Sequence, residues 1–270
     1  MSAIPPAPLL QRSSGLTRFI LAPNPGPMSL DGTNSYVLQA PGTPSVAVVD
    51  PGPLEEPHLR ALADSGDVEL ILVTHRHADH TAGSARLQEL TGAPVRAADP
   101  AHCHGGGQPL RDGEVIHAAG VEITVLASPG HTSDSVCFHL PGDGVYGSVL
   151  TGDTILGRGT TMLDFPDGTL GSYLATLERL QALGPATVLP AHGPVLPSLE
   201  AVARDYRLHR QDRLDQIRAA LDRLGRDATA GEVADAVYSD VVPSVRRAAE
   251  QSVAAQLHYL RKEAGQASGR

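Results

Sequence analysis

The sequence predicts an α/β fold over residues 1–198 and a small helical region over residues 199–270. Short apolar runs rich in β-branched residues alternate with turn signals in the first region, which is typical of strands. Between these runs, apolar residues recur at helical spacing. Turn-forming residues are rare beyond position 197, where only Pro243 and four of the 28 glycines occur.

Seven apolar runs in the first region are predicted to be strands: residues 33–39, 45–52, 68–75, 121–130, 135–140, 147–153 and 186–194. Residues 85–90 are predicted to form a helix that Gly92 closes. A second helix is predicted from the stripe formed by Tyr173, Leu174, Leu177 and Leu180.

Two further stripes predict helices in the second region: Leu214, Ile217, Leu221 and Leu224, then Val253, Leu257 and Leu260. Between them, Thr229 and Glu232 have the spacing of a capping box, which predicts the start of a short helix. We therefore expect an all-helical region here, or one with a minor hairpin.

Composition narrows the class of protein. The formal net charge is −9, aromatic residues make up 3% and tryptophan is absent, so a general nucleic-acid coat protein is not expected. Cys103 and Cys137 are too few and too far apart for a disulfide framework. The N-terminal segment lacks the apolar core of a signal peptide and no segment approaches a membrane span, so we expect a cytoplasmic protein without a membrane partner.

One segment concentrates potential metal ligands. His75, His77, Asp79 and His80 lie directly after a predicted strand and directly before a helix. His75 and His77 are two residues apart and point to one side of an extended turn. Asp79 and His80, at the start of the helix, can point into the same space from a different level. Imidazole and carboxylate ligands suit Zn²⁺ or a neighbouring transition metal. Taken alone, this segment is also compatible with a satisfied polar turn.

Three more candidates follow strand-like runs farther along the chain: His131, Asp153 and His192. Loops at strand ends are where a sandwich of sheets gathers functional groups. With these three, the pattern HxHxDH, then His, Asp and His, resembles the metallo-β-lactamase superfamily over roughly residues 18–198. The resemblance implies an αβ/βα four-layer sandwich with a dinuclear metal site at one edge between two sheets.

The resemblance also implies a role for each ligand. His75, His77 and His131 would hold the first metal and Asp79, His80 and His192 the second, with Asp153 bridging them. Two divalent transition-metal ions, with Zn²⁺ preferred, would activate a bridging hydroxide for hydrolysis, which makes Asp79 and Asp153 the catalytic carboxylates.

Other polar residues support weaker predictions. Asp50 matches a family position near the site and would orient a ligand histidine, but capping of the Asp-Pro-Gly turn explains it equally well. The cluster from His102 to His104 has no strand scaffold and is predicted to be surface. Cys137 is predicted to be a packed thiol. We expect five further histidines to be structural or surface residues: His58, His117, His139, His209 and His258.

The substrate is less defined than the reaction. Many true β-lactamases have a Cys ligand where this chain has Asp153, so its site resembles the thioesterase, lactonase and phosphodiesterase branches. Residues 206–225, 229–238 and 251–265 resemble the winged-helix-like region of the lactamase-β-like 2 endoribonuclease family, which implies single-stranded RNA as a substrate. The rival is a small-molecule substrate, namely a hydroxyacylglutathione-type thioester or a lactone.

A basic stretch bears on this choice. Residues 201–226 contain seven Arg and four Asp, a local balance of +3. Arg207, Arg210 and Arg213 are candidate substrate-binding residues that would clamp phosphates; the alternative is a solvated helix face with Asp partners. A metal-binding interaction module without catalysis also stays open, as does a homo-oligomer.

Overall fold

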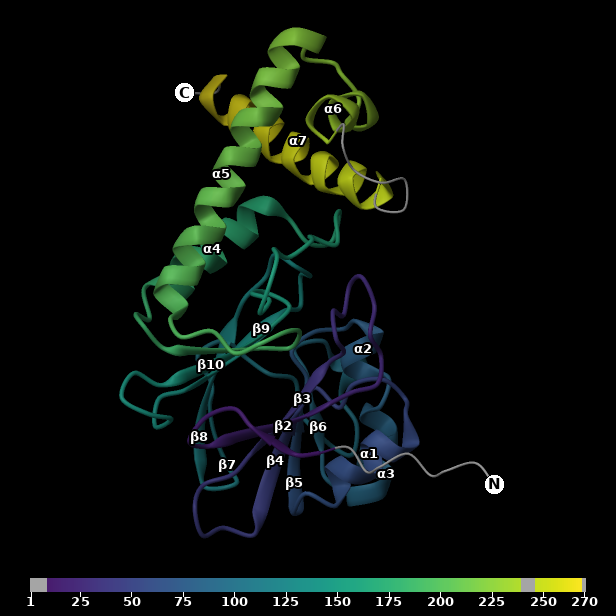
Figure 1. Cartoon of the computed structure of the whole chain (residues 1–270), viewed down its shortest axis with the longest axis vertical. Coiled ribbons are helices and arrows are strands. Elements are labelled where there is room, and N and C mark those ends of the chain that lie inside the picture. Colours follow the sequence, from purple (N-terminus) through teal and green to yellow (C-terminus); the bar gives the residue numbers. More distant parts are fainter. Residues whose placement is uncertain (1–8, 239–245, 269–270) are drawn as a thin grey trace.

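The structure is a computed structural model that describes residues 9–238 and 246–268, without the side chains of residues 264–268. Two β-sheets face each other, and helices cover the outer face of each sheet (Figure 1). The predicted αβ/βα four-layer sandwich is therefore confirmed.

The first sheet has the strand order β1-β2-β3-β4-β5-β6. Its first four strands pair antiparallel, and β4–β5 and β5–β6 pair parallel. The strands are β1 (Gln11–Arg12), β2 (Thr17–Leu21), β3 (Asn34–Leu38), β4 (Ser45–Val49), β5 (Asp67–Leu72) and β6 (Val95–Arg96).

The second sheet has the order β11-β10-β9-β8-β7, antiparallel except for the parallel pair β10–β11. Its strands are β7 (Val115–Ala118), β8 (Val121–Ala127), β9 (Val136–Leu140), β10 (Ser148–Gly152) and β11 (Thr187–Pro190).

Side-chain alternation along the strands builds the layers. In β4, Ala47 and Val49 enter the core between the sheets, whereas Val46 and Val48 pack under the helices on the outer face. Successive strand residues point to opposite faces, so a strand covered on both sides is apolar at every position. The short apolar runs of the sequence therefore correspond to strands inside the sandwich.

Helices α1 (Glu56–Ala63) and α3 (Ser84–Thr91) cover the first sheet through Leu59, Leu62 and Leu87. Helix α4 (Leu170–Gln181) covers the second sheet through Tyr173, Leu177 and Leu180. Two short helices, α2 (Ala78–Thr81) and the 3₁₀ helix η1 (Pro100–His102), lie in connections.

The C-terminal region contains α5 (Leu199–Leu224), α6 (Ala230–Val237) and α7 (Arg246–Ser268). Thr229 and Glu232 form the predicted capping box at the start of α6. The described part of residues 199–270 shows these three helices and no strand, so no wing hairpin is seen there. No described helix is both long and apolar enough to span a membrane.

The division at residue 198 stays a prediction. Helix α5 begins at Leu199, but Leu199, Ala203 and Tyr206 pack into the same cluster as α4. A second apolar cluster farther along α5 contains Ile217 with Val233 of α6 and Val253 of α7. The long helix α5 therefore links the sandwich to the helical region above it (Figure 1).

Candidate metal centre

The HxHxDH segment lies where β5 leaves the first sheet. His75 follows β5 by three residues, His77 is the N-cap of α2, and Asp79 and His80 lie inside that short helix. The second sheet contributes the other three candidates, because His131, Asp153 and His192 follow the ends of β8, β10 and β11. All seven predicted ligands thus come from one edge of the sandwich.

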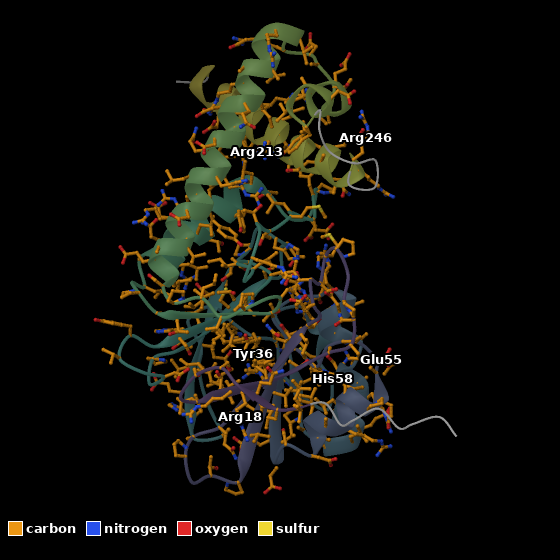
Figure 2. The ribbon with its side chains drawn as sticks, in the orientation of Figure 1. Arg18, Tyr36, Glu55, His58, Arg213 and Arg246 are labelled. Carbon is orange, nitrogen blue, oxygen red and sulfur yellow. The ribbon has the colours of Figure 1, made fainter. Side chains whose placement is uncertain are left out.

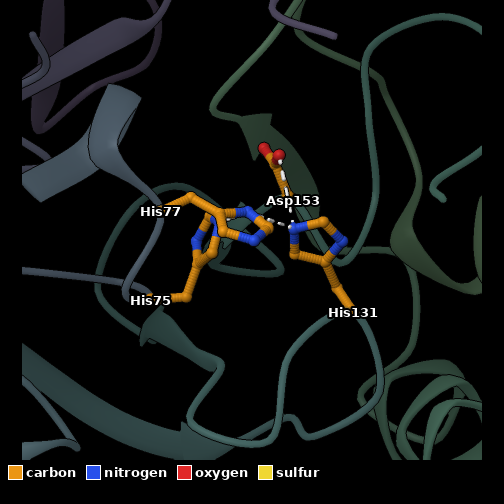
Figure 3. A group of neighbouring side chains, drawn as sticks. All are labelled: His75, His77, His131 and Asp153. Carbon is orange, nitrogen blue, oxygen red and sulfur yellow. Dashed lines mark hydrogen bonds and ion pairs between the residues drawn. The ribbon is translucent and has the colours of Figure 1, made fainter. Parts of the chain in front are cut away.

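These seven side chains form two groups. The first contains His75, His77, His131 and Asp153, and the second contains Asp79, His80 and His192; within each group the candidate ligand atoms lie within 4.8 Å of one another. In the first group, His77 Nδ1 lies 3.0 Å from both His75 Nε2 and His131 Nε2. Figure 3 shows the three imidazoles and the carboxylate of Asp153 converging on one point.

Asp153 lies between the two groups. Its Oδ2 atom is 3.7 Å from His131 Nε2 in the first group. Its Oδ1 atom is 3.2 Å from His192 Nε2 and 3.6 Å from His80 Nε2 in the second group. One carboxylate therefore presents a different oxygen to each group.

Several polar atoms at this centre lack a hydrogen-bond partner among the described residues. His80 Nε2, His192 Nε2 and Asp153 Oδ1 are buried and have no hydrogen-bond partner there. Buried polar atoms normally have a partner, since leaving one unpaired is costly. A metal ion would satisfy such atoms, so the residues present fit a metal centre.

Hydrogen bonds to the far side of four imidazole rings turn Nε2 toward the centre. His80 Nδ1 donates to Asp50 Oδ2 over 2.9 Å, and His75 Nδ1 is 3.1 Å from Thr74 Oγ1. The Nδ1 atoms of His131 and His192 face the backbone carbonyls of Met162 and Gly32, at 2.6 and 3.1 Å. Such outer contacts fix the tautomer and orientation of metal-binding histidines.

His77 is turned the other way, and the residue facing it was not predicted from the sequence. Its Nε2 atom lies 3.3 Å from Asp164 Oδ2. Asp164 and Asp167 both pair with the guanidinium of Arg76, the residue before His77. The loop that carries the two aspartates is therefore tied to the HxHxDH segment.

Charges at the centre favour a cation. Burial would lower the pKa of His192, but the neighbouring carboxylates of Asp153 and Asp79 raise that pKa to about 10. Burial also opposes the ionisation of Asp153, yet His80 and His192 hold its pKa well below the ordinary value. The negative carboxylates that favour a proton on His192 would also attract metal ions.

Two glycines permit the close approaches that the site needs. Gly130 precedes His131 with φ +150°, and a Cβ there would lie 2.5 Å from Tyr173 Cα in α4. Gly152 precedes Asp153 with φ +50°, and a Cβ there would lie 2.7 Å from Thr74 Oγ1. Larger residues would push the segment before His131 from α4 and the end of β10 from the segment after β5.

The arginine row does not form one surface. Arg207 Nη1 donates to Gln181 Oε1 of α4 over 2.7 Å. Arg210 is only 5% exposed and donates to the backbone carbonyl of Thr161, while Arg213 lies over the Tyr238 ring. A step of three residues rotates by about 60° around a helix, so Arg207 faces α4, whereas Arg210 and Arg213 line one cavity. The substrate-binding role of these arginines stays a prediction.

The remaining predictions concern cysteines and other histidines. Cys137 is buried in the apolar cluster under α4, and Cys103 is free and partly exposed. His58 is buried and lies 2.9 Å from Ser35 Oγ, so its environment is structural. Neither His102 nor His104 belongs to a metal-ligand group among the described residues.

Comparison with known proteins agrees with the fold. The Metallo-beta-lactamase superfamily profile matches residues 28–192. This chain therefore belongs to the metallo-β-lactamase superfamily.

Three similar proteins illustrate this membership. The lactamase-like protein adaB of Aspergillus niger is 32% identical over 230 residues, which cover 82% of this chain and 68% of adaB. The atrochrysone carboxyl ACP thioesterase of Aspergillus chevalieri is 32% identical over 257 residues, covering 93% of this chain and 80% of that enzyme. A metallo-beta-lactamase family protein from Thermus thermophilus has a TM-score of 0.73 and 25% identity, with 92% of this chain and 94% of that chain covered.

Proposed function

We propose that this chain is a dinuclear metal-dependent hydrolase whose substrates are thioesters. The observation that carries the dinuclear proposal is the position of Asp153, with Oδ2 toward His131 and Oδ1 toward His80 and His192. A shared carboxylate lowers the repulsion between two cations that lie about 3.5–4 Å apart in such sites.

In this proposal, His75, His77 and His131 hold one ion, Asp79, His80 and His192 hold the other, and Asp153 contacts both. Nitrogen and oxygen ligands without a thiolate suit Zn²⁺, which we favour, and neighbouring divalent transition metals. Two such ions would lower the pKa of a bound water molecule and polarise the substrate carbonyl.

The protein residues determine from which side the substrate approaches. The side chains of His77 and Asp79 are 32% and 31% exposed, whereas those of His80 and His192 are fully buried. We therefore place the substrate on the side of His77 and Asp79. The buried ligands keep the opposite side dry, which strengthens the electrostatic interactions at the centre.

Among the superfamily substrates, one observation argues against β-lactams and a second favours thioesters. The chain has Asp153 where many true β-lactamases have a cysteine ligand. A relative that aligns with 93% of this chain is an ACP thioesterase. RNA is the less supported substrate, because Arg207 bonds to Gln181 of α4 and does not line the cavity that Arg210 and Arg213 share, so the three provide no continuous phosphate row.

A hydrolysis screen tests this proposal. Metal-loaded protein is incubated with an S-acyl pantetheine, the matching oxygen ester, a lactone, a β-lactam and single-stranded RNA. We expect the thioester to have the highest kcat/KM, and Asp153→Asn to abolish its hydrolysis. Cleavage of RNA or the lactone without thioester cleavage would overturn the substrate assignment, and inactivity on every substrate would favour a binding module.

A further inference from the structure

A cavity of about 240 Å³ lies beside the candidate metal centre, between the loop at residues 160–162 and helices α5 and α7. Figure 2 labels Arg213, one of the α5 residues in its wall. The polar residues that line the cavity are Thr160, Thr161, His209, Arg210, Arg213, Tyr238 and Ser252.

Arg210 in this wall is a buried cation without a counter-ion among the described residues. It is 5% exposed, and no described carboxylate lies within ion-pair distance of its guanidinium. Its contacts are the Thr161 carbonyl and the face of Tyr173, 5.1 Å from the guanidinium carbon, and its Nε atom has no described partner. A buried charge is costly unless an opposite charge accompanies it.

Two neighbouring groups extend this positive wall. Arg213 donates to Gln216 and lies over the Tyr238 ring, but it makes no described ion pair. His209 Nδ1 is buried without a described partner. Burial and the charges of Arg210 and Arg213 lower the pKa of His209, against the opposing charge of Asp212.

The cavity wall is directly connected to the metal-site residues. Thr161 Oγ1 donates to the backbone carbonyl of Asp153 over 2.7 Å. The carbonyl of Met162, which also lines the cavity, accepts from His131 Nδ1. The cavity therefore borders the segments that carry two of the candidate ligands.

We propose that this cavity binds the phosphate of a phosphopantetheine thioester. This inference rests on the proposed thioesterase function and names the part of the substrate that the enzyme recognises. Thioesters on a carrier protein are attached through a phosphodiester, so an anionic oxygen group always accompanies the reacting carbonyl. Arginine suits this group because its N–H donors form charge-assisted hydrogen bonds with phosphate oxygens.

The test compares two substrates that differ only in that phosphate. Metal-loaded protein hydrolyses S-acyl 4′-phosphopantetheine and S-acyl pantetheine, and thiol release gives kcat and KM for each. We expect KM for the phosphorylated substrate to be at least about tenfold lower, the effect of one charge-assisted hydrogen bond.

Arg213→Gln should remove this difference. Its KM for S-acyl pantetheine should stay within about twofold of the parent value, while KM for the phosphorylated substrate rises to a similar level. The matched control is Arg218→Gln, on the same helix but paired with Asp215 and Glu263 and outside this cavity. This control should keep the tenfold preference.

Equal KM values for the two substrates in the parent protein would overturn the phosphate assignment, as would an equal loss of preference in both variants. An effect of Arg213→Gln on an acyl-glutathione alone would also overturn it, in favour of carboxylate recognition.

A binding measurement separates this inference from the proposed function. If neither thioester is hydrolysed, the thioesterase proposal fails. The phosphate site is then tested by titrating 4′-phosphopantetheine into the zinc-loaded protein at fixed pH. NMR follows the His209 imidazole resonance during this titration. The phosphate site would still be supported if 4′-phosphopantetheine shifts the resonance of the parent protein to saturation. Pantetheine should cause no such shift, and neither should 4′-phosphopantetheine added to Arg213→Gln. Identical spectra with both compounds would refute it.

Discussion

His80 and Asp50 form a fully buried pair in which His80 Nδ1 donates to Asp50 Oδ2 over 2.9 Å. The same carboxylate accepts hydrogen bonds from the backbone N–H and the hydroxyl of Thr74, each over 2.8 Å. Asp50 therefore positions His80 directly and His75 through the preceding residue. Its backbone has φ 55°, a left-handed conformation that Asp and Asn tolerate better than most residues.

Asp50→Asn tests this positioning role. The amide keeps the left-handed backbone and one oxygen for the Thr74 N–H, but places an NH₂ donor against the N–H of His80. We expect zinc affinity to fall by about 10- to 100-fold, the usual effect of losing an outer partner of a metal ligand. Competition with a chelating dye measures this affinity. If zinc binds with parental affinity, Asp50 is merely a turn residue.

Asp164 should have a similar role for His77. We expect Asp164→Asn to weaken zinc binding by about tenfold or more, because His77 Nε2 loses its charged acceptor. Asp167→Asn is the matched control, since Asp167 also pairs with Arg76 but makes no described contact with His77. Equal losses in both variants would assign the effect to the Arg76 pairs instead.

The buried His58 should make the fold sensitive to acid. Burial lowers its pKa to about 4, so the unfolded chain binds a proton between about pH 6.5 and pH 4 that the folded chain does not bind. Stability must therefore decrease as pH falls through this window. We expect His58 to account for about 2 kcal/mol of the stability lost between pH 7 and pH 5.

His58→Gln isolates this contribution while retaining a side chain that can bond to Ser35. Urea unfolding of parent and variant at both pH values should give a pH dependence that is about 2 kcal/mol smaller for the variant. Acid-induced metal loss affects both proteins and cancels in this comparison. The same pH dependence in both proteins would show that His58 is protonated without penalty in the folded state.

The sequence predicts the strands inside the sandwich because burial on both faces makes them continuous apolar runs. All seven predicted strands occur, with ends that differ by a few residues. Strand β2 and helix α1 were not predicted: Arg18 interrupts the apolar pattern of β2, and α1 has only 8 residues. Their formation depends on packing against Val37 and Ile71, which local patterns do not report.

The candidate site shows the same limit. Its seven proposed ligands follow a recognisable spacing, and the structure brings them together, while their metal-binding roles stay a prediction. Asp164 has no spacing signal, because only the fold brings it to His77 across 87 positions of sequence. Arg210 carries the same charge as its exposed neighbours in the sequence, and its burial follows from the packing of α5 against α4.

Metal stoichiometry tests the central claim, a dinuclear centre joined by Asp153, most directly. Zinc is titrated into metal-free parent protein and Asp153→Asn, with calorimetry for affinity and elemental analysis after desalting for content. We predict about two tightly bound ions per parent chain and no more than one per Asp153→Asn chain, since the amide loses the charge that offsets the repulsion between two cations. A parent protein that is fully active with one ion per chain, or an Asp153→Asn variant that retains two, would contradict the claim.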